Sequence, residues 1–246
     1  MEYKLEYRHF TKFQPNNVKL NNTSNRLNKI SIGPEHRLVD EFLNQGLPSS
    51  LHRSIPAILR EPKLPTGYPD LVVVFVPTTL SVILTRPINL TSSHFKVLHH
   101  IYQSRGISID TLKDDLAFNR SINKRIVSDL EQCRLIYNQN GVLRAKSLKD
   151  IFLARRIVAI EAKISNWHRA LSQALANTWF ASESYILLPE SKNNKLLLLN
   201  AKRLGLGVIT TNGKNSKIEL RSNQNKIPLS YGSWLINEII LKKIAG

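Results

Sequence analysis

Cysteine is almost absent from this chain, since Cys133 is the one cysteine among 246 residues. A single thiol cannot form a disulfide framework within the chain, and it cannot supply the ligands of a zinc ribbon. Cys133 falls at an apolar position of a helical pattern, so we expect a buried thiol. No apolar run is as long as a membrane span, and the first residues, MEYKLEYRHFTKFQ, lack the apolar segment of a secretory signal. These absences predict a cytoplasmic protein, and the length is sufficient to bury a sizeable hydrophobic core.

Acidic residues are also scarce, with 18 Asp and Glu against 35 Lys and Arg. The formal net charge is +17 and the isoelectric point is about 10.1. Such an excess predicts a polyanionic partner, most simply nucleic acid, because Lys and Arg that neutralise phosphates dominate the affinity for it. A solvated surface and adhesion to anionic lipid are the alternatives. The composition of 42% hydrophobic and 22% charged residues is typical of a globular protein.

Several catalytic motifs are missing. The seven histidines show no HExxH or other spacing typical of metal ligands, and His99 and His100 are adjacent in a helical pattern. Neither a GxSxG motif nor a phosphate-binding P-loop is present. The sequence therefore argues against a serine hydrolase and against an NTPase.

Strands and helices alternate through most of the chain. Residues 1–34 are polar and rich in Asn, and we expect a loose arm or short strands there. EHRLVDEFLNQGLPSS, from Glu35, predicts an amphipathic helix. The apolar run Leu71–Val76 predicts a central strand that is buried on both faces, and RRIVAIEAK predicts a second strand. A helix over 165–180, the strand SYILLP, the helix NNKLLLLNAKRLG, the strand LGVITTNG and the helix YGSWLINEIILKKI follow. This order predicts an α/β fold with one main sheet.

A different pattern lies between the two buried strands. SSHFKVLHHIYQSRG, ISIDTLKDDLAF and NRSINKRIVSDLEQCRLI predict three helices, and Asn140-Gly141 in LIYNQNGVLRAK predicts a tight hairpin. Three helices followed by a hairpin resemble a winged helix-turn-helix module, which covers residues 91–147. The main domain is then discontinuous, with residues 1–90 and 148–246.

Basic and amide side chains cluster at the start of the third helix of this module, where a recognition helix contacts base edges and phosphates. The hairpin adds two basic residues as a wing contact. The predicted DNA-binding residues of the module are Asn119, Arg120, Asn123, Lys124, Arg125, Arg144 and Lys146. The alternative is that the module contacts protein, as many winged helices do.

Glu161 and Lys163 are the charged residues at the end of an apolar strand. Side chains two residues apart on a strand share a face, so both point the same way and Ala162 faces the other layer. A buried charged pair costs desolvation free energy unless a partner compensates it, and a divalent metal with a phosphate would do so. Glu161 suits Mg²⁺, and the carbonyl of Ala162 supplies a further oxygen. Lys163 is predicted to hold or deprotonate the attacking water, or to neutralise charge on the phosphorane. Asp70 is predicted to provide a second carboxylate from a neighbouring strand.

The segments GYPDLVVV and VAIEAK resemble the PD-(D/E)XK, or restriction-endonuclease-like, nuclease superfamily. This resemblance implies a mixed sheet flanked by helices and Mg²⁺-dependent (with Mn²⁺ as a substitute) hydrolysis of phosphodiester bonds. It implies that Asp70, Glu161 and Ala162 bind the metal and that Lys163 is catalytic. A helix with a Gln often follows the second motif, and Gln173 takes that place. Some helicase-associated members carry Tyr one turn later, where this chain has Asn177, so it is not assigned to that branch.

The chain departs from the family by the module inserted between the two motifs. Such an insertion is tolerated where its two ends lie close together, because the closure cost grows slowly with loop length. Upstream, ILREPKLPTG resembles the strand before the Asp strand, and Glu61 is a candidate additional or outer ligand.

Each of these residues has a simpler structural explanation. Asp70 after Pro69 fits a turn cap, Glu161 with Lys163 fits a surface ion pair, and Glu61 fits an ordinary surface charge. Gln173 belongs to a polar stripe on its helix that fits either a solvated face or the site. The stripe consists of Asn166, Arg169, Gln173 and Asn177, of which Arg169 is also a candidate DNA contact. The aromatic side chains Trp167 and Trp179 are predicted to be core anchors rather than platforms for stacked bases.

The leading hypothesis from the sequence is a Mg²⁺-dependent DNA endonuclease in which the winged helix positions the duplex. The family implies a role in restriction, phage defence, DNA repair or element mobility. Cutting both strands needs two active sites, so a homodimer or a nicking partner is expected. One alternative is a non-catalytic winged-helix DNA-binding regulator or assembly factor with an inactive nuclease-like fold. Another is an RNA nuclease.

Overall fold

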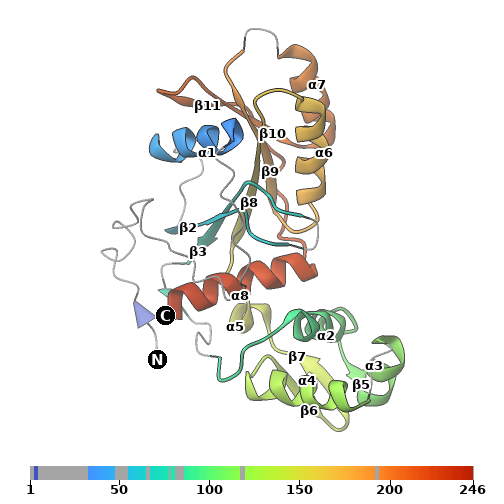
Figure 1. Ribbon diagram of the computed structural model, residues 1–246. Coiled ribbons are helices and arrows are strands. Elements are labelled where there is room, and N and C mark those ends of the chain that lie inside the picture. The colour runs from blue at the N-terminus through green and yellow to red at the C-terminus, as the bar shows by residue number, and fades with distance from the viewer. Residues whose placement is uncertain are drawn as a thin grey trace.

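The computed structural model describes residues 3–4, 33–47, 55–64, 67–77, 79–80, 86–116, 120–191 and 194–245. It shows an α/β protein with a six-stranded mixed sheet, a small antiparallel sheet and flanking helices (Figure 1). The large sheet has the order β11-β10-β9-β8-β3-β2. Its strands are β2 (Ile55–Arg60), β3 (Leu71–Val76), β8 (Arg156–Ala162), β9 (Glu183–Pro189), β10 (Gly207–Thr211) and β11 (Ser216–Leu220).

Strand direction changes across this sheet. The pairs β2–β3, β3–β8 and β10–β11 are antiparallel, and the pairs β8–β9 and β9–β10 are parallel. The parallel strands are joined by α6 (Trp167–Asn177) and α7 (Lys195–Leu204), as the alternation of strands and helices predicts. All six residues of β3 are buried, which confirms a strand covered on both faces. The edge strand β11 was not predicted.

Helices cover the two faces of the large sheet. On one face, the apolar side of α1 (Pro34–Asn44) packs on alternate residues of β8, including Val158, Ile160 and Ala162. On the opposite face, α6 and α7 pack over β9 and β10. Figure 1 shows α1 and the α6–α7 pair on opposite sides of the sheet. Glu161 alternates with the residues that face α1, so its side chain points to the α6 side.

The segment between β3 and β8 forms a compact group of short elements. Three helices, α2 (Ser92–Gln103), α3 (Ile109–Leu116) and α4 (Arg120–Gln132), accompany a three-stranded antiparallel sheet in the order β5-β7-β6. These strands are β5 (Ile107–Ser108), β6 (Ile136–Gln139) and β7 (Val142–Ala145). The predicted hairpin is confirmed: β6 and β7 pair through Asn140 and Gly141, with φ angles of 52° and 83°. Cys133 is buried, as expected.

The C-terminal helix α8 (Tyr231–Ala245) holds both ends of the inserted segment. Arg86, before α2, lies 3.5 Å from the Glu238 carboxylate. After the segment and the short helix α5 (Leu148–Ile151), the backbone N–H groups of Leu153 and Ala154 donate to Asn237 Oδ1 at 2.6 and 3.2 Å. The two ends therefore meet at adjacent residues of one helix, which allows the chain to leave β3 and return to β8.

Trp234 of α8 packs between the two parts of the fold. It is buried and makes edge-to-face contacts with Tyr102 of α2 and with Phe152, at ring-centroid distances of 6.2 and 5.0 Å. One cluster of buried apolar side chains runs from α2–α4 through α8 to β3 and β8. Figure 1 shows α8 between the large sheet and the α2–α4 group.

The predictions for Trp167 and Trp179 had mixed outcomes. Trp167 is partly buried against the cluster under α6 and α7, and it stacks on His168. Trp179 is 41% exposed, so its prediction as a core anchor is wrong. It follows the end of α6, where the chain turns into β9, and its ring lies against the backbone of Gly232.

Most of the predicted N-terminal arm lies outside the described residues. Of that arm, β1 (Tyr3–Lys4) pairs antiparallel with β4 (Thr79–Leu80). In the part of the chain that the structure describes, no helix has both the length and the apolar character needed to cross a membrane.

Candidate active site

The fold brings Asp70 and Glu161 together at one end of the central strand pair. Asp70 immediately precedes β3, and Glu161 lies near the end of β8, where Leu71 pairs with Ile160. The backbone N–H of Ala162 donates to Asp70 Oδ2 at 2.8 Å. The inserted segment therefore does not separate the two acids, because the antiparallel β3–β8 register fixes them side by side.

Lys163 lies at the centre of the charged cluster. Its ammonium group donates to Glu35 Oε2 at 3.0 Å and to the carbonyl of Ala162 at 2.8 Å, and it lies 3.6 Å from Asp70 Oδ2. Lys163 is only 7% exposed. One buried cation is thus shared between two carboxylates and a backbone carbonyl.

Glu35 was not a predicted site residue. It occupies the first turn of α1, where an acidic side chain is common because it interacts favourably with the helix dipole. Its position far upstream of both motifs gave no indication of a partner. Packing of α1 across the sheet brings it to Lys163.

Asn177 is a second residue that the sequence did not assign to the site. It lies at the end of α6, it is buried, and its Nδ2 donates to Glu161 Oε1 at 2.6 Å. The signal that could have identified it is its position one helical turn after Gln173 on the polar stripe. The hydrogen bond fixes the orientation of the Glu161 carboxylate.

The second oxygen of Glu161 is buried and has no hydrogen-bond partner. The pKa of Glu161 is raised to about 7, chiefly because the carboxyl group is buried; the neighbouring Asp70 carboxylate adds to this rise, while the Asn177 hydrogen bond and the Lys163 charge oppose it. Neither oxygen of Glu161 contacts the Lys163 ammonium, which bonds Glu35 and the Ala162 carbonyl instead. The site therefore contains a buried carboxylate with one oxygen available to a cation.

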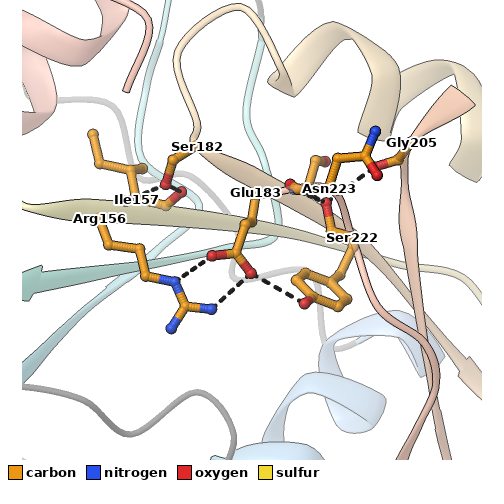
Figure 2. A network of polar contacts seen from close by, with 9 residues as sticks. Arg156, Ile157, Ser182, Glu183, Gly205, Ser222 and Asn223 are labelled. Atoms are coloured by element: carbon orange, nitrogen blue, oxygen red, sulfur yellow. Dashed lines mark hydrogen bonds and ion pairs between the residues drawn. The ribbon is translucent and has the colours of Figure 1, made fainter. Parts of the chain in front are cut away.

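A second buried glutamate on the next strand shows the contrasting, fully paired arrangement (Figure 2). Glu183 of β9 receives two hydrogen bonds from the guanidinium of Arg156, one of them at 2.6 Å, and a third from the Tyr185 hydroxyl at 3.1 Å. Burial, followed by the Glu183 charge, raises the pKa of Tyr185 to about 12. Both carboxylates are about equally buried, so incomplete pairing of Glu161 is not simply a consequence of depth.

Two further predicted residues lie near this cluster. Gln173 is on α6 one turn before Asn177, and its Oε1 is buried without a hydrogen-bond partner. Glu61 has an exposed side chain, and its backbone N–H donates to the carbonyl of Asp70 at 3.2 Å. In the described chain no contact joins the Glu61 carboxylate to Asp70, Glu161 or Lys163, so its contribution here is through the backbone.

The predicted DNA contacts are found on the outside of the fold, where they are described. Five of these side chains are exposed: Lys124 and Arg125 on α4, Arg144 on β7, Lys146 directly after β7, and Arg169 on α6. Arg144 donates to the carbonyl of Arg105 at 2.7 Å, and Lys146 lies over the ring of Tyr137 at 5.2 Å. Arg120 and Asn123 belong to α4, and Asn119 lies outside the described residues.

The residues present fit a hard divalent cation. Within the described ranges no group of three or more His, Cys, Asp and Glu side chains is arranged to hold a metal ion. Mg²⁺, however, is usually held by one or two carboxylates together with water and substrate oxygens. Asp70, the unpaired oxygen of Glu161 and the carbonyl of Ala162 form such a set, although Lys163 already donates to that carbonyl.

Comparison of the chain with models of protein families, with curated proteins and with solved structures gives no match.

Proposed function

We propose that the protein is a Mg²⁺-dependent endonuclease that hydrolyses DNA phosphodiester bonds. The proposed fold is restriction-endonuclease-like, with residues 91–147 as an inserted winged helix-turn-helix domain that positions the duplex. The order helix, strand, helix, helix, strand, strand of α2 to β7 supports the winged-helix assignment. The antiparallel β2–β3–β8 unit, followed by α6 and the parallel strand β9, supports the nuclease assignment.

One observation carries the proposal: the buried Glu161 carboxylate keeps one oxygen without a partner beside Asp70 and Lys163. Burying a charge without compensation is costly. The same sheet pairs Glu183 completely with Arg156, so the fold has the means to neutralise a buried acid. A site that retains a partly unpaired carboxylate beside a second acid is suited to an added cation.

The proposed roles follow from the contacts. Asp70 and Glu161 would hold the metal, which supplies Lewis-acid stabilisation of charge on the phosphate when it is bound. The Ala162 N–H fixes Asp70, and Asn177 fixes Glu161, so both carboxylates are pre-oriented. The Lys163 ammonium stabilises negative charge that develops on the phosphate oxygens, and Glu35 positions this ammonium.

The proposal is tested by incubating supercoiled plasmid with the purified protein and Mg²⁺, and in parallel with EDTA. We expect conversion to nicked or linear DNA with Mg²⁺ and none with EDTA. Cleavage that continues in EDTA would contradict a metal mechanism. DNA binding without any cutting in either Mg²⁺ or Mn²⁺ would reject the enzyme and favour the DNA-binding regulator. A parallel incubation with RNA of the same sequence separates the DNA nuclease from the RNA nuclease.

The proposed DNA-binding surface is tested through its dependence on salt. The logarithm of DNA affinity falls with the logarithm of salt concentration, and each phosphate contact makes this slope more negative by about 0.9. We expect Lys124→Ala and Arg125→Ala each to weaken binding by a similar factor for unrelated sequences and to make the slope less steep by about 1. Fluorescence anisotropy with two unrelated duplexes measures both quantities. Lys202→Ala, at an exposed position of α7 on the other part of the fold, is the control and should leave the slope unchanged. Equal effects of all three variants would contradict this surface.

A further inference from the structure

A cleft lies beside the candidate active site, on the side of α1. Its volume is about 900 Å³, and it runs between α1 and the loops that follow β9 and β10. Two of its wall residues, Pro34 and Ile164, are the sequence neighbours of the paired residues Glu35 and Lys163. The cleft therefore lies beside the two segments that carry Glu35 and Lys163, although neither of these residues lines it. We name it the α1–β10 cleft.

The walls of the α1–β10 cleft combine apolar and hydrogen-bonding groups. Pro34, Leu38, Ile164 and Pro189 provide the apolar surface, and Ile164 is 43% exposed although it is aliphatic. The polar groups gather near the ends of β9 and β10 and include Ser191, Thr211 and Asn212. A volume of this order with apolar walls and a few polar groups is typical of sites for small organic groups.

The charge of the α1–β10 cleft differs from that of the whole chain. Among the described residues that line it, Arg37 is the one basic side chain, against the two acids Glu41 and Glu190, while the chain carries a net charge of +17. Two carboxylates repel a phosphate, so the cleft does not suit the sugar–phosphate backbone. Carboxylates accept hydrogen bonds from exocyclic amino groups such as N4 of cytosine. The chemistry therefore suits a nucleobase rather than a phosphate.

We infer that the α1–β10 cleft receives an unpaired nucleobase of the DNA strand, next to the phosphate that is cut. The inference rests on the proposed function for the position of that phosphate. A base leaves a duplex at a cost that is lowest where it is already mismatched or unpaired. The substrate class is therefore DNA with an unpaired nucleotide, and the carboxylates favour bases with an amino group over thymine.

The test compares the affinity of the full-length protein for three short duplexes that differ at one position. One duplex is fully paired, one has a single unpaired cytosine, and one has a single unpaired thymine. Ca²⁺ replaces Mg²⁺ so that the strands remain intact during anisotropy measurements. We expect the cytosine duplex to bind roughly tenfold tighter than the paired one and about fivefold tighter than the thymine duplex.

Glu190→Gln examines the same cleft without touching the proposed catalytic groups. Gln both donates and accepts hydrogen bonds, so the preference for cytosine over thymine should disappear in this variant. Glu131→Gln, at an exposed position of α4, changes the net charge equally and should keep the preference. Equal binding of the three duplexes by the wild type, or equal behaviour of the two variants, would overturn the inference.

The outcomes for the cleft and for the nuclease are separate. Plasmid cleavage in Mg²⁺ with equal affinity for the three duplexes rejects the base-binding cleft and leaves the nuclease. A cytosine preference that depends on Glu190, in a protein that does not cut DNA, supports the cleft and rejects the nuclease.

Discussion

The Asp70→Asn variant is expected to cleave DNA about a hundred to a thousand times more slowly than the wild-type protein. Asparagine keeps an oxygen that can accept the hydrogen bond from the Ala162 N–H, so the β3–β8 junction should remain intact. It removes the negative charge that lies 3.6 Å from the Lys163 ammonium and beside Glu161. The substitution should therefore lower the rate of the chemical step and the affinity for the metal, while the stability of the fold should stay nearly unchanged. Initial rates of plasmid nicking across a Mg²⁺ titration measure both.

Asp150→Asn is the matched control for this experiment. Asp150 is an exposed acid in the short helix α5, so the same substitution there changes the net charge equally. We expect this variant to cut at the wild-type rate. Circular dichroism of all three proteins verifies that their folds are equal. If Asp70→Asn cuts within a factor of three of the wild type, Asp70 has no role at the reaction centre.

The juxtaposition of Asp70 and Glu161 was predictable because it depends on local patterns. An unbroken apolar run indicates a strand that is buried on both faces. A charged residue at the end of such a strand must then lie against the helices that cover the sheet. Each of the two acids stands at the end of such a run, and direct pairing of β3 with β8 brings these ends together. The intervening segment could be long because α8 anchors both of its ends through Asn237 and Glu238.

Glu35 and Asn177 could not be assigned in the same way. Each of these two residues reaches the site because its helix packs on the sheet. The sequence pattern of a helix identifies its buried face, but it does not identify the partner of a polar side chain at the end of the helix. The polar stripe of α6 shows this limit. Its member Asn177 is buried against Glu161, while Arg169 on the same stripe is exposed. Whether a polar side chain on such a stripe faces solvent or enters a site depends on which residues of the neighbouring strand lie opposite it.

The edge strand β11 was missed for a related reason. Its sequence, SKIEL, alternates polar and apolar residues over a short length, and the strand is only partly covered. Such a pattern is weak evidence for a strand at the edge of a sheet. Pairing with β10, which is fully buried, provides the missing stabilisation.

The Glu161→Gln variant is expected to be more stable than the wild type at pH 8 and inactive as a nuclease. Burial raises the pKa of Glu161 from 4.5 to about 7 in the folded protein. The folded state therefore binds this proton more tightly than the unfolded state. The contribution of Glu161 to stability is fully present below pH 4.5 and is lost as the pH rises through about 7. At about 1.4 kcal/mol for each tenfold change in proton affinity, the cost of the ionised form is on the order of 3 kcal/mol.

Glutamine removes that cost because it cannot ionise, and its oxygen still accepts the hydrogen bond from Asn177. Urea unfolding should show a gain of about 2–3 kcal/mol in the free energy of unfolding at pH 8 and little change at pH 4.5. Added Mg²⁺ should stabilise the wild type at pH 8 and leave the variant unaffected, because a ligand that binds only the folded state increases its stability. The metal would thus compensate the charge that the fold leaves unpaired.

Glu183→Gln provides the opposite result on the next strand. Glu183 is as deeply buried but is paired with Arg156, so the substitution removes the negative charge that receives two hydrogen bonds from this guanidinium. Breaking such a pair costs about 3–5 kcal/mol. We therefore expect the two Glu→Gln substitutions to change stability in opposite directions at pH 8, although the glutamates lie on neighbouring strands. If both variants lost stability at pH 8, Glu161 would be a structural acid, and the argument for a cation beside it would fail.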